Sequence, residues 1–484
     1  GMLVHQIARH QSLYPLVMFT SHDARFFPSI RSPEGLEVQF DRILCDVMCS
    51  SDGTLRKSPH LWREWSPKQS LELHRDQLAV ALRAARLLKV GGQMAYSTCS
   101  MSPIEDEAVV AELLRCTRSS LKLVDCRQRL APLLTREGLR CWKVSHPNGR
   151  HLYNSYAEVQ HPGRHKLLQA SNFPPPMDSA LSSELSKCIR VLPHDNDTGG
   201  FFIALFEKVA SVPPEQEDEE GVARAYDSDR DEDGEELERE RQLQRLEEAV
   251  ATGKSEQERL KATTRRERAK SSGSLARELA RYLSLPNAMP QHPVSLRSTF
   301  GLDATFPMEL LFCRYHLELN SDGEQVRTHE GEANQIILCA GRTADLLTWG
   351  TGEHAKRKLK VIAGGLRAFE KDRFEVSERT SQFRFAQEAL ELIVPYVGQR
   401  LVDLEDPADM RRLLGSCRDA PTAVLVSAGR SQLEALSPGG CILLLCAENG
   451  KRLPVSALRT HRAVNLFVND LQMPALRKAC GLPA

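Results

Sequence analysis

The feature that most constrains the fold is a strand–loop–helix pattern that occurs twice between Phe40 and Arg115. Phe40–Val47 is an apolar run typical of a strand, and it ends in a Ser- and Gly-rich turn. Pro67–Leu88 repeats apolar residues at three- and four-residue spacing, which predicts an amphipathic helix that Gly91-Gly92 should end.

The second unit repeats the pattern with shorter elements. Met94–Ser97 predicts a short strand, and Glu105–Arg115 predicts a helix whose acidic first turn suits the helix dipole. Strands that alternate with helices indicate an α/β domain with a parallel sheet. Arg190–Glu207 predicts an antiparallel pair that closes this sheet.

Four polar residues follow the expected strand ends. Asp23 comes after the short apolar run Leu16–Thr20, Asp46 and Cys49 come after Phe40–Val47, and Cys99 comes after Met94–Ser97. Ligands of open α/β sheets bind beyond the carboxyl ends of the strands, so these positions predict a site. Two plainer interpretations stay open: Asp23 can cap a helix or turn, and a single cysteine is often a small buried hydrophobe.

The rest of the chain predicts three regions. We expect a first domain over residues 1–209 and a charged, low-complexity linker over residues 210–274. Residues 275–484 contain short apolar runs and Gly-rich turns, which predict a mixed α+β, barrel-like domain. Arg164–Lys166 is a basic cluster that suits either phosphate contact or a solvated loop.

Composition narrows the class of protein. The formal net charge is +0, so a basic surface for nucleic acid requires segregated charge. No apolar run approaches the roughly 18 residues of a membrane span. The 13 cysteines include no CxxC pair, and no secretion signal is visible, so we expect reduced thiols and no metal site.

The two cysteine segments resemble known motifs. D-V-M-C-S-S-D-G-T at Asp46–Thr54 and S-T-C-S-M-S-P-I-E-D-E at Ser97–Glu107 resemble the cysteine motifs of the Nop/Sun (NSun) RNA cytosine-5 methyltransferases. L-H-R-D-Q-L at Leu73–Leu78 and P-H-x-x-x-T-G-G-F-F at Pro193–Phe202 extend the resemblance, which is closest to eukaryotic tRNA-modifying members. A weaker likeness, to a domain similar to PUA RNA-binding modules, runs from about Thr299 to the end.

This resemblance implies a fold and an activity. The first domain would be a Rossmann-like methyltransferase sheet that uses S-adenosylmethionine to methylate carbon 5 of cytosine in tRNA, with other RNAs as further candidates. Cys99 would attack carbon 6, and Cys49 would assist release of the product. Asp46 would lie by the target base and the methionine part of the cofactor, and Asp23 would contact the adenine. The family also implies a nuclear or nucleolar location, with the cytoplasm open.

Three departures from the motifs qualify the expectation. Met48 replaces a proline before the first cysteine, and Ser51 replaces a glycine where the backbone can need a positive φ. The family's glycine-containing cofactor loop would precede Leu3, so we interpret the chain as a fragment whose sheet is incomplete. The alternatives are a degenerate relative that binds RNA without catalysis and an interaction protein built around the charged insert.

Overall fold

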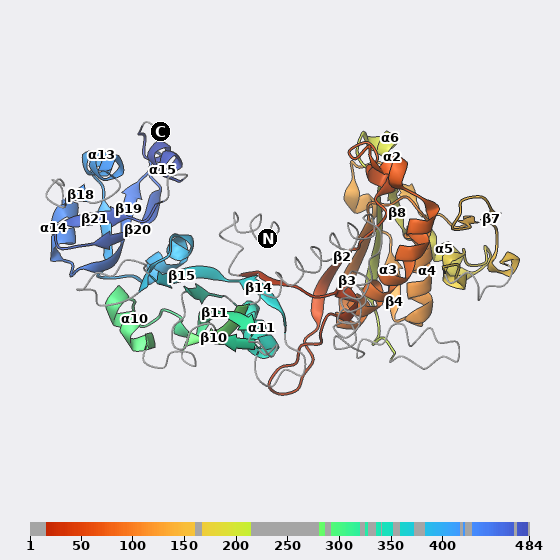
Figure 1. The fold of residues 1–484 in the computed structure, drawn as a ribbon, viewed down its shortest axis with the longest axis horizontal. Coiled ribbons are helices and arrows are strands. Elements are labelled where there is room, and N and C mark those ends of the chain that lie inside the picture. The colour runs from red at the N-terminus through yellow and green to blue at the C-terminus, as the bar shows by residue number, and fades with distance from the viewer. Residues whose placement is uncertain are drawn as a thin grey trace, which may run out of the picture. The chain divides into compact units, whose positions relative to one another are not determined.

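The computed structural model divides the chain into two compact units, His22–Arg245 and Gly1–Ser21 with Leu246–Ala484 (Figure 1). It describes residues 16–159, 167–213, 280–285, 292–319, 325–327, 335–339, 341–351, 359–371, 383–416, 420–421, 428–468 and 472–482. Three parts of the chain lie outside these residues: Leu3–Arg9, where the apolar spacing predicts the end of a helix, the basic cluster Arg164–Lys166 and nearly all of the charged linker.

A six-stranded mixed sheet forms the centre of the first unit. Its order is β2–β3–β9–β8–β5, and β4 also pairs with β9. The strands are β2 Phe40–Asp46, β3 Leu88–Thr98, β4 Leu121–Val124, β5 Arg136–Glu137, β8 Ile189–Val191 and β9 Phe201–Lys208. Only β2 and β3 run parallel, and β9 lies antiparallel to β3, β4 and β8. The parallel strand–helix–strand unit and the closing antiparallel pair are therefore confirmed.

Two helices pack side by side against one face of this sheet: α3 Pro67–Leu87 and α4 Glu107–Cys116 (Figure 1). The apolar stripe expected on α3 is buried, with Leu78, Ala81 and Ala85 at most 1% exposed. Strand β9 alternates, so that Phe202, Ala204, Phe206 and Lys208 are buried while the intervening residues are partly exposed. The period of the sequence thus decides which side of each element meets the core.

The junction between α3 and β3 differs from the expectation. The helix ends at Leu87 and the strand begins at Leu88, so Gly91-Gly92 lies inside the strand. Leu88 already pairs with Phe40, and Gly91 has a φ of +81° next to the shift in β2–β3 register. Pairing with β2 overrides the stop signal, and Gly91 supplies the left-handed backbone of the irregularity rather than a helix cap.

The strand expected at Leu16–Thr20 is present as β1 Met18–Thr20. It pairs antiparallel with β14 Val361–Gly364 of the second unit instead of joining the sheet that carries the cysteines. Phe19 is 7% exposed and belongs to the apolar core of the second unit. Burial of this aromatic ring and two strand edges explains the pairing. Residues 16–21 therefore belong to the same compact unit as β14 in this structure.

The second unit contains two further sheets, which confirms its mixed α+β character. One is antiparallel, in the order β10–β11–β13–β15–β16 with β12 beside β11; the other, β17–β19–β20–β21–β18, contains the parallel pair β17–β19. The strands are β10 Ala280–Ser284, β11 Leu311–Leu319, β12 Gln325–Arg327, β13 Gln335–Leu338, β15 Leu366–Lys371, β16 Phe383–Phe385, β17 Leu401–Leu404, β18 Ala420–Pro421, β19 Gly439–Cys446, β20 Arg452–Arg459 and β21 Ala463–Leu466.

Helices and aromatic packing complete this unit. Its helices include α10 His292–Phe300, α11 Arg342–Thr351, α12 Leu390–Ile393, α13 Pro407–Ser416, α14 Ala428–Ala435 and α15 Met473–Ala479. The ring centroid of Phe300 lies 4.8 Å from that of Phe369 and 4.6 Å from that of Phe385. Ser456 Oγ donates to Phe385 O at 2.6 Å, which ties β20 to β16. Thr422–Val426, an apolar run that predicts a further strand, lies outside the described residues.

Among the described residues, no helix has the length and apolar character needed to cross a membrane.

Candidate active site

Cys49 and Cys99 meet at one end of the β2–β3 pair. Their sulfur atoms lie 3.2 Å apart, although the residues are 50 positions apart in the sequence. Both side chains are partly exposed, and Ser51 Oγ lies 3.4 Å from the sulfur of Cys99 and 3.8 Å from that of Cys49. The structure therefore brings together the two thiols that the sequence placed at neighbouring strand ends.

Backbone hydrogen bonds fix the two cysteine loops in register. Gly53 N donates to Cys99 O at 2.9 Å, and Gly200 N donates to Gly53 O at 2.7 Å. A β-carbon on Gly53 would lie 2.6 Å from Cys99 O and 2.7 Å from Gly200 O. Only glycine permits this approach, so the loop after β2 can lie directly against the loop after β3 and the turn before β9.

Ser51 adopts the left-handed conformation that the sequence flagged. Its φ is 60° and its ψ is 22° at the start of the 3-10 turn Asp52–Thr54. A residue with a β-carbon pays roughly 1–2 kcal/mol for this conformation, which glycine avoids. In the same loop, Met48 is 49% exposed and its carbonyl accepts from Gln77 Nε2 at 2.9 Å. The Met48 side chain therefore faces solvent, while its backbone is held by α3.

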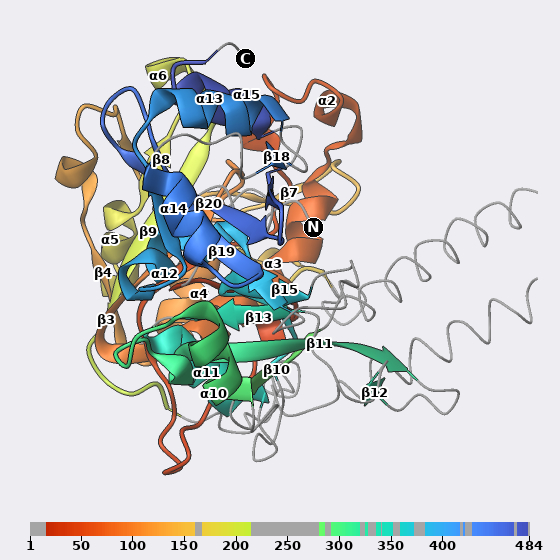
Figure 2. The same ribbon diagram turned by 90° about the vertical axis from the view of Figure 1, so that its left-hand side faces the viewer.

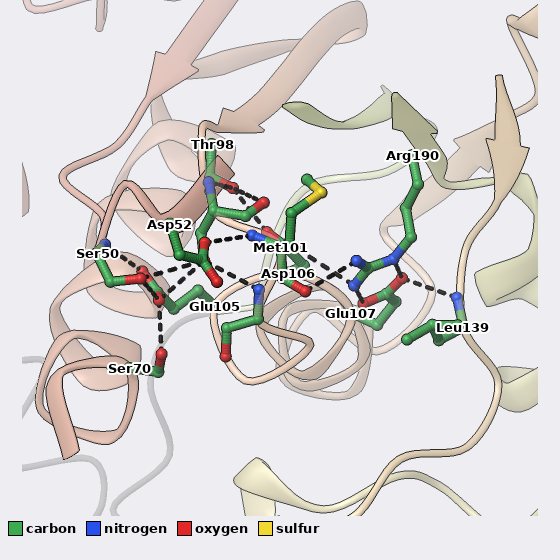
Figure 3. Close-up of polar contacts among 12 residues, drawn as sticks. Ser50, Asp52, Ser70, Thr98, Met101, Glu105, Asp106, Glu107, Leu139 and Arg190 are labelled. Carbon is green, nitrogen blue, oxygen red and sulfur yellow. Dashed lines mark hydrogen bonds and ion pairs between the residues drawn. The ribbon is translucent and has the colours of Figure 1, made fainter. Parts of the chain in front are cut away.

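A buried carboxylate, Glu105, joins both loops to α3 (Figure 3). Ser50 donates to it through its backbone N at 2.8 Å and through Oγ at 2.5 Å, and Ser100 Oγ donates at 3.0 Å. From α3, Ser70 Oγ donates at 2.7 Å and Gln77 Nε2 at 3.0 Å. Ser50 follows Cys49 and Ser100 follows Cys99, so one carboxylate positions both thiol loops.

The next two carboxylates form a second buried cluster (Figure 3). Asp106 Oδ1 accepts from Thr98 Oγ1 at 2.7 Å, and Arg190 forms ion pairs with Asp106 and Glu107. Burial, followed by the Glu107 charge, raises the pKa of Asp106 well above its ordinary value. This cluster clamps β8 to the start of α4, because Arg190 belongs to β8.

Sequence reasoning missed these roles. It interpreted Glu105, Asp106 and Glu107 as an acidic first turn, but the helix begins only at Glu107 and all three side chains are fully buried. Three adjacent carboxylates are rarely buried without partners. The serines beside both cysteines and the isolated arginine in Arg190–Leu192 were the available signals, but pairing them requires the fold.

The pKa of the Cys49 thiol lies above its ordinary value. Burial, together with the hydrogen bond and charge of Cys99, raises the pKa of Cys49 to about 12. Cys49 therefore keeps its proton at neutral pH and is a weak nucleophile, since the thiolate is the reactive form. It stands as a protonated neighbour at hydrogen-bond distance from the sulfur of Cys99.

The two aspartates occupy different settings. Asp46 is exposed at the end of β2, and Ser97 Oγ donates to it at 3.4 Å. Asp23 caps the 3-10 helix Ala24–Phe26 and accepts from the backbone and guanidinium of Arg25, which also pairs with Asp76. The structure thus brings Asp46 to the strand end that leads to Cys49, whereas Asp23 serves as the cap that the sequence left open.

Asp46 fits a cofactor role better than Asp23 does. Its carboxylate is exposed at the carboxyl end of a parallel strand, where α/β sheets hold nucleotide cofactors. Both carboxylate oxygens of Asp23 already accept from Arg25, so contact with an adenine amine would have to share the carboxylate with this guanidinium. Among the described residues, no group of three or more His, Cys, Asp or Glu side chains could hold a metal ion.

Two sequence models of known protein families match separate parts of the chain. Residues 12–140 match the sequence model described as 16S rRNA methyltransferase RsmB/F, and residues 286–398 match the NSUN2 Pre-PUA domain. The chain is therefore similar to the RsmB/F methyltransferases in one region and to the NSUN2 Pre-PUA domain in another, which confirms the resemblance indicated by the cysteine motifs.

Two individual relatives each match a little under half of this chain. The tRNA (cytosine(34)-C(5))-methyltransferase of Drosophila melanogaster is 39% identical over 45% of this chain and 29% of its own length. The multisite-specific tRNA:(cytosine-C(5))-methyltransferase of Saccharomyces cerevisiae is 42% identical over 43% of this chain and 30% of its own length. The chain therefore spans about 30% of the length of these relatives.

A solved structure also matches part of the chain. NSun6 from Pyrococcus horikoshii with SFG is 25% identical over 36% of this chain and 31% of that one, with a TM-score of 0.21. That score is too low for an argument from structure alone.

Proposed function

We propose that this chain takes part in methylation of carbon 5 of cytosine in tRNA, with Cys99 as the nucleophile. The observation that carries the proposal is the 3.2 Å approach of two thiols from separate strand ends, with Cys49 held in its protonated form. The relatives named as tRNA cytosine-5 methyltransferases support the substrate class. The parallel pair β2–β3 is consistent with a Rossmann-like methyltransferase domain, and the Pre-PUA match supports a PUA-like, RNA-binding second region.

Cytosine carbon 5 is a poor nucleophile until the ring loses its aromaticity. When the sulfur of Cys99 bonds to carbon 6, the ring electrons move toward N3, and carbon 5 gains enamine character. A carboxyl group near N3 can stabilise the adduct as it forms, and Asp46 is the exposed acid at the end of β2. The polar loop, with Ser51 Oγ 3.4 Å away, suits a thiol that must react.

S-adenosylmethionine would supply the electrophilic methyl group, and Asp46 is the described residue placed to help hold it. The proposed role of Asp23 at the adenine stays a prediction, in which the carboxylate would accept from the adenine amine beside Arg25.

Release of the product reverses the sulfur addition. The carbon 5 proton leaves to a base, the carbon 5–carbon 6 double bond returns, and the sulfur of Cys99 departs with the bonding electrons. The Cys49 thiol can donate a hydrogen bond to that departing sulfur, because the two sulfur atoms are 3.2 Å apart. Without this donor, the covalent protein–RNA adduct would persist.

The test is methyl transfer to tRNA from labelled S-adenosylmethionine, assayed with the chain and with any upstream coding sequence restored. Cys99→Ala should abolish transfer, and Cys49→Ala should accumulate a covalent protein–RNA species on a denaturing gel. Cys141→Ala is the matched control, because Cys141 is exposed outside the thiol pair. Full transfer by Cys99→Ala would overturn the mechanism.

A second candidate, RNA binding without catalysis, is favoured by the departures at Met48 and Ser51. The left-handed Ser51 shows that the altered turn is strained. Restoring the glycine in Ser51→Gly, with and without Met48→Pro, separates the two: RNA binding with no methyl transfer in every variant would favour the binding protein.

The nuclear or nucleolar location also stays a prediction, which imaging of a fluorescent fusion can check.

A further inference from the structure

The segment Arg56–Arg63, between the first cysteine loop and α3, exposes an unusual group of side chains. The indole of Trp62 is 72% exposed. Arg56, Lys57, His60 and Arg63 are also exposed, and no acidic residue occurs between Asp52 and Glu64. Arg56 pairs with Asp197, whereas Lys57 and Arg63 have no ion pair among the described residues.

This segment is held next to the thiols. Trp62 lies on the short helix α2, Leu61–Glu64, and Trp65 follows directly. Trp65 Nε1 donates to Ser50 Oγ at 3.2 Å, and Ser50 adjoins Cys49. In both ribbon views α2 lies at the same end of the first unit as α6, Pro193–Asn196, which precedes the Gly200 turn of the site (Figures 1 and 2). The exposed indole therefore belongs to the rim of the candidate active site.

The chemistry of this rim selects a partner. An exposed indole offers a flat apolar face on which a nucleic-acid base can stack, and neighbouring cations attract phosphates. A protein partner could also use the indole, but Lys57 and Arg63, two cations without an ion pair among the described residues, favour a polyanion. A base that must reach the thiols also has to leave its stack, which leaves its neighbour without a stacking partner.

We propose that Arg56–Arg63 forms an RNA-contact surface, in which Trp62 stacks on an unpaired base beside the target cytosine and Lys57 and Arg63 contact the adjacent phosphates. This inference rests on the proposed function for the identity of the target. It adds the requirement that the RNA next to the target is locally single-stranded, because only an unpaired base can present its face to Trp62.

The first experiment measures binding of a fluorescein-labelled, single-stranded RNA with one central cytosine by the full chain. Trp62→Ala should raise the Kd about tenfold, since stacking on one aromatic side chain contributes this much in single-strand complexes. Trp62→Phe should stay close to wild type, because it keeps a stacking face. Lys57→Glu and Arg63→Glu should weaken binding and flatten its dependence on salt.

Matched controls keep the result specific. Leu152→Ala removes another exposed apolar side chain, 55% exposed on β7, Leu152–Tyr153, and Lys122→Glu reverses an exposed charge on β4. Neither should change the Kd as Trp62→Ala and Lys57→Glu do. Wild-type binding by Trp62→Ala, equal losses in the controls or no binding by the wild type would each overturn the proposal.

Placement and function are tested separately. A photocrosslinking amino acid at position 62 should label the nucleotide beside the cytosine, and labelling spread evenly along the RNA would overturn the stacking role. If this label and the Trp62 dependence are found without methyl transfer, the surface stands and the proposed function fails. Methyl transfer that is unaffected by Trp62→Ala in both KM and kcat leaves the function and removes the surface.

Discussion

Glycine at position 53 allows the two thiols to meet. Its amide donates to Cys99 O, and its own carbonyl accepts from Gly200, so its α-carbon lies between two other loops. These backbone contacts hold the two cysteine loops together independently of the cysteine side chains. The distance between the sulfur atoms is thus a property of the backbone, set by a residue that carries no chemistry.

Gly53→Ala should therefore separate the thiols. A β-carbon would lie under 3 Å from two backbone oxygens, which cannot move aside as a flexible side chain would. We expect a loss of about 2 kcal/mol in the free energy of unfolding and loss of methyl transfer. Gly199→Ala is the control, because the nearest atom to its β-carbon would be 3.6 Å away. Similar behaviour of the two variants in urea unfolding and activity would contradict this account.

The raised pKa of Cys49 predicts a reactivity difference. Because Cys49 stays protonated well above the ordinary pKa of 9.0, iodoacetamide should modify it more slowly than the exposed Cys141 between neutral pH and about pH 10. Cys99→Ala removes a hydrogen bond and a charge that favour the thiol form, so it should speed modification of Cys49. Mass spectrometry of the alkylated peptides measures both rates, and equal rates for Cys49 in the two proteins would contradict the prediction.

The same shift has a consequence for stability. As pH rises from 9.0 to about 12, the unfolded chain loses the Cys49 proton while the folded chain keeps it. The folded state then binds more protons, so its stability falls with rising pH in this window.

Among the elements, α3 connects the site to the core. Its buried side chains Ser70 and Gln77 donate hydrogen bonds to Glu105, and its apolar stripe packs in the core beside β2 and β3. The sequence predicted this helix well, since its buried stripe has the helical period. It could not predict the length of β3, because a glycine pair is a stop signal that only pairing with β2 overrides.

Glu105→Ala should destabilise both cysteine loops. It leaves the donors of Ser50, Ser70 and Gln77 unpaired in a buried setting, at a cost of about 3 kcal/mol or more. Hydrogen exchange should rise at residues 49–53 and 99–102, and urea unfolding should shift to lower concentration. The exposed Glu64→Ala serves as the control, and loop exchange equal to that of Glu64→Ala would show that Glu105 does not hold the loops.

His74 on α3 predicts a dependence on acid. Burial lowers its pKa, and its ring lies 2.8 Å from Ile104 O and 2.9 Å from Ser171 Oγ. The unfolded chain protonates this histidine near pH 6.5 while the folded chain does not, so stability is lost as pH falls below that value.

The measurement compares wild type with His74→Gln between about pH 7.5 and about pH 5.5. Exchange of the α3 amides should accelerate on acidification in the wild type and less so in the variant. An equal acceleration in both proteins would assign the pH dependence to other groups.

At the scale of the whole molecule, β1 shows that a local sequence pattern can predict a strand without predicting its partner. The apolar run at Leu16–Thr20 predicts a strand correctly, but nothing local specifies its partner, which lies some 340 residues away in β14. The approach of the two thiols could be predicted because both cysteines follow strands with clear patterns. Asp23 was open between a ligand and a cap, and only the contact with Arg25 decides its present role.

Phe19→Asp should consequently destabilise the second unit. Phe19 is 7% exposed within the second unit's core, whereas Leu16 is 58% exposed and provides Leu16→Asp as the control. Exchange should rise in β14 and β15 and stay unchanged in β3. A rise confined to β3 would mean that this segment belongs with the first unit after all.

The backbone contacts among the three loops also bear on how such a sequence can drift. Gly53, Cys99 and Gly200 are joined by amide-to-carbonyl bonds, and the Met48 side chain points to solvent. The Met48 side chain can therefore be replaced with a small loss, whereas the two glycines constrain each other, because a side chain on either would strike the other's backbone. Inheritance of the thiol pair depends more on these two positions than on the residues that flank the cysteines.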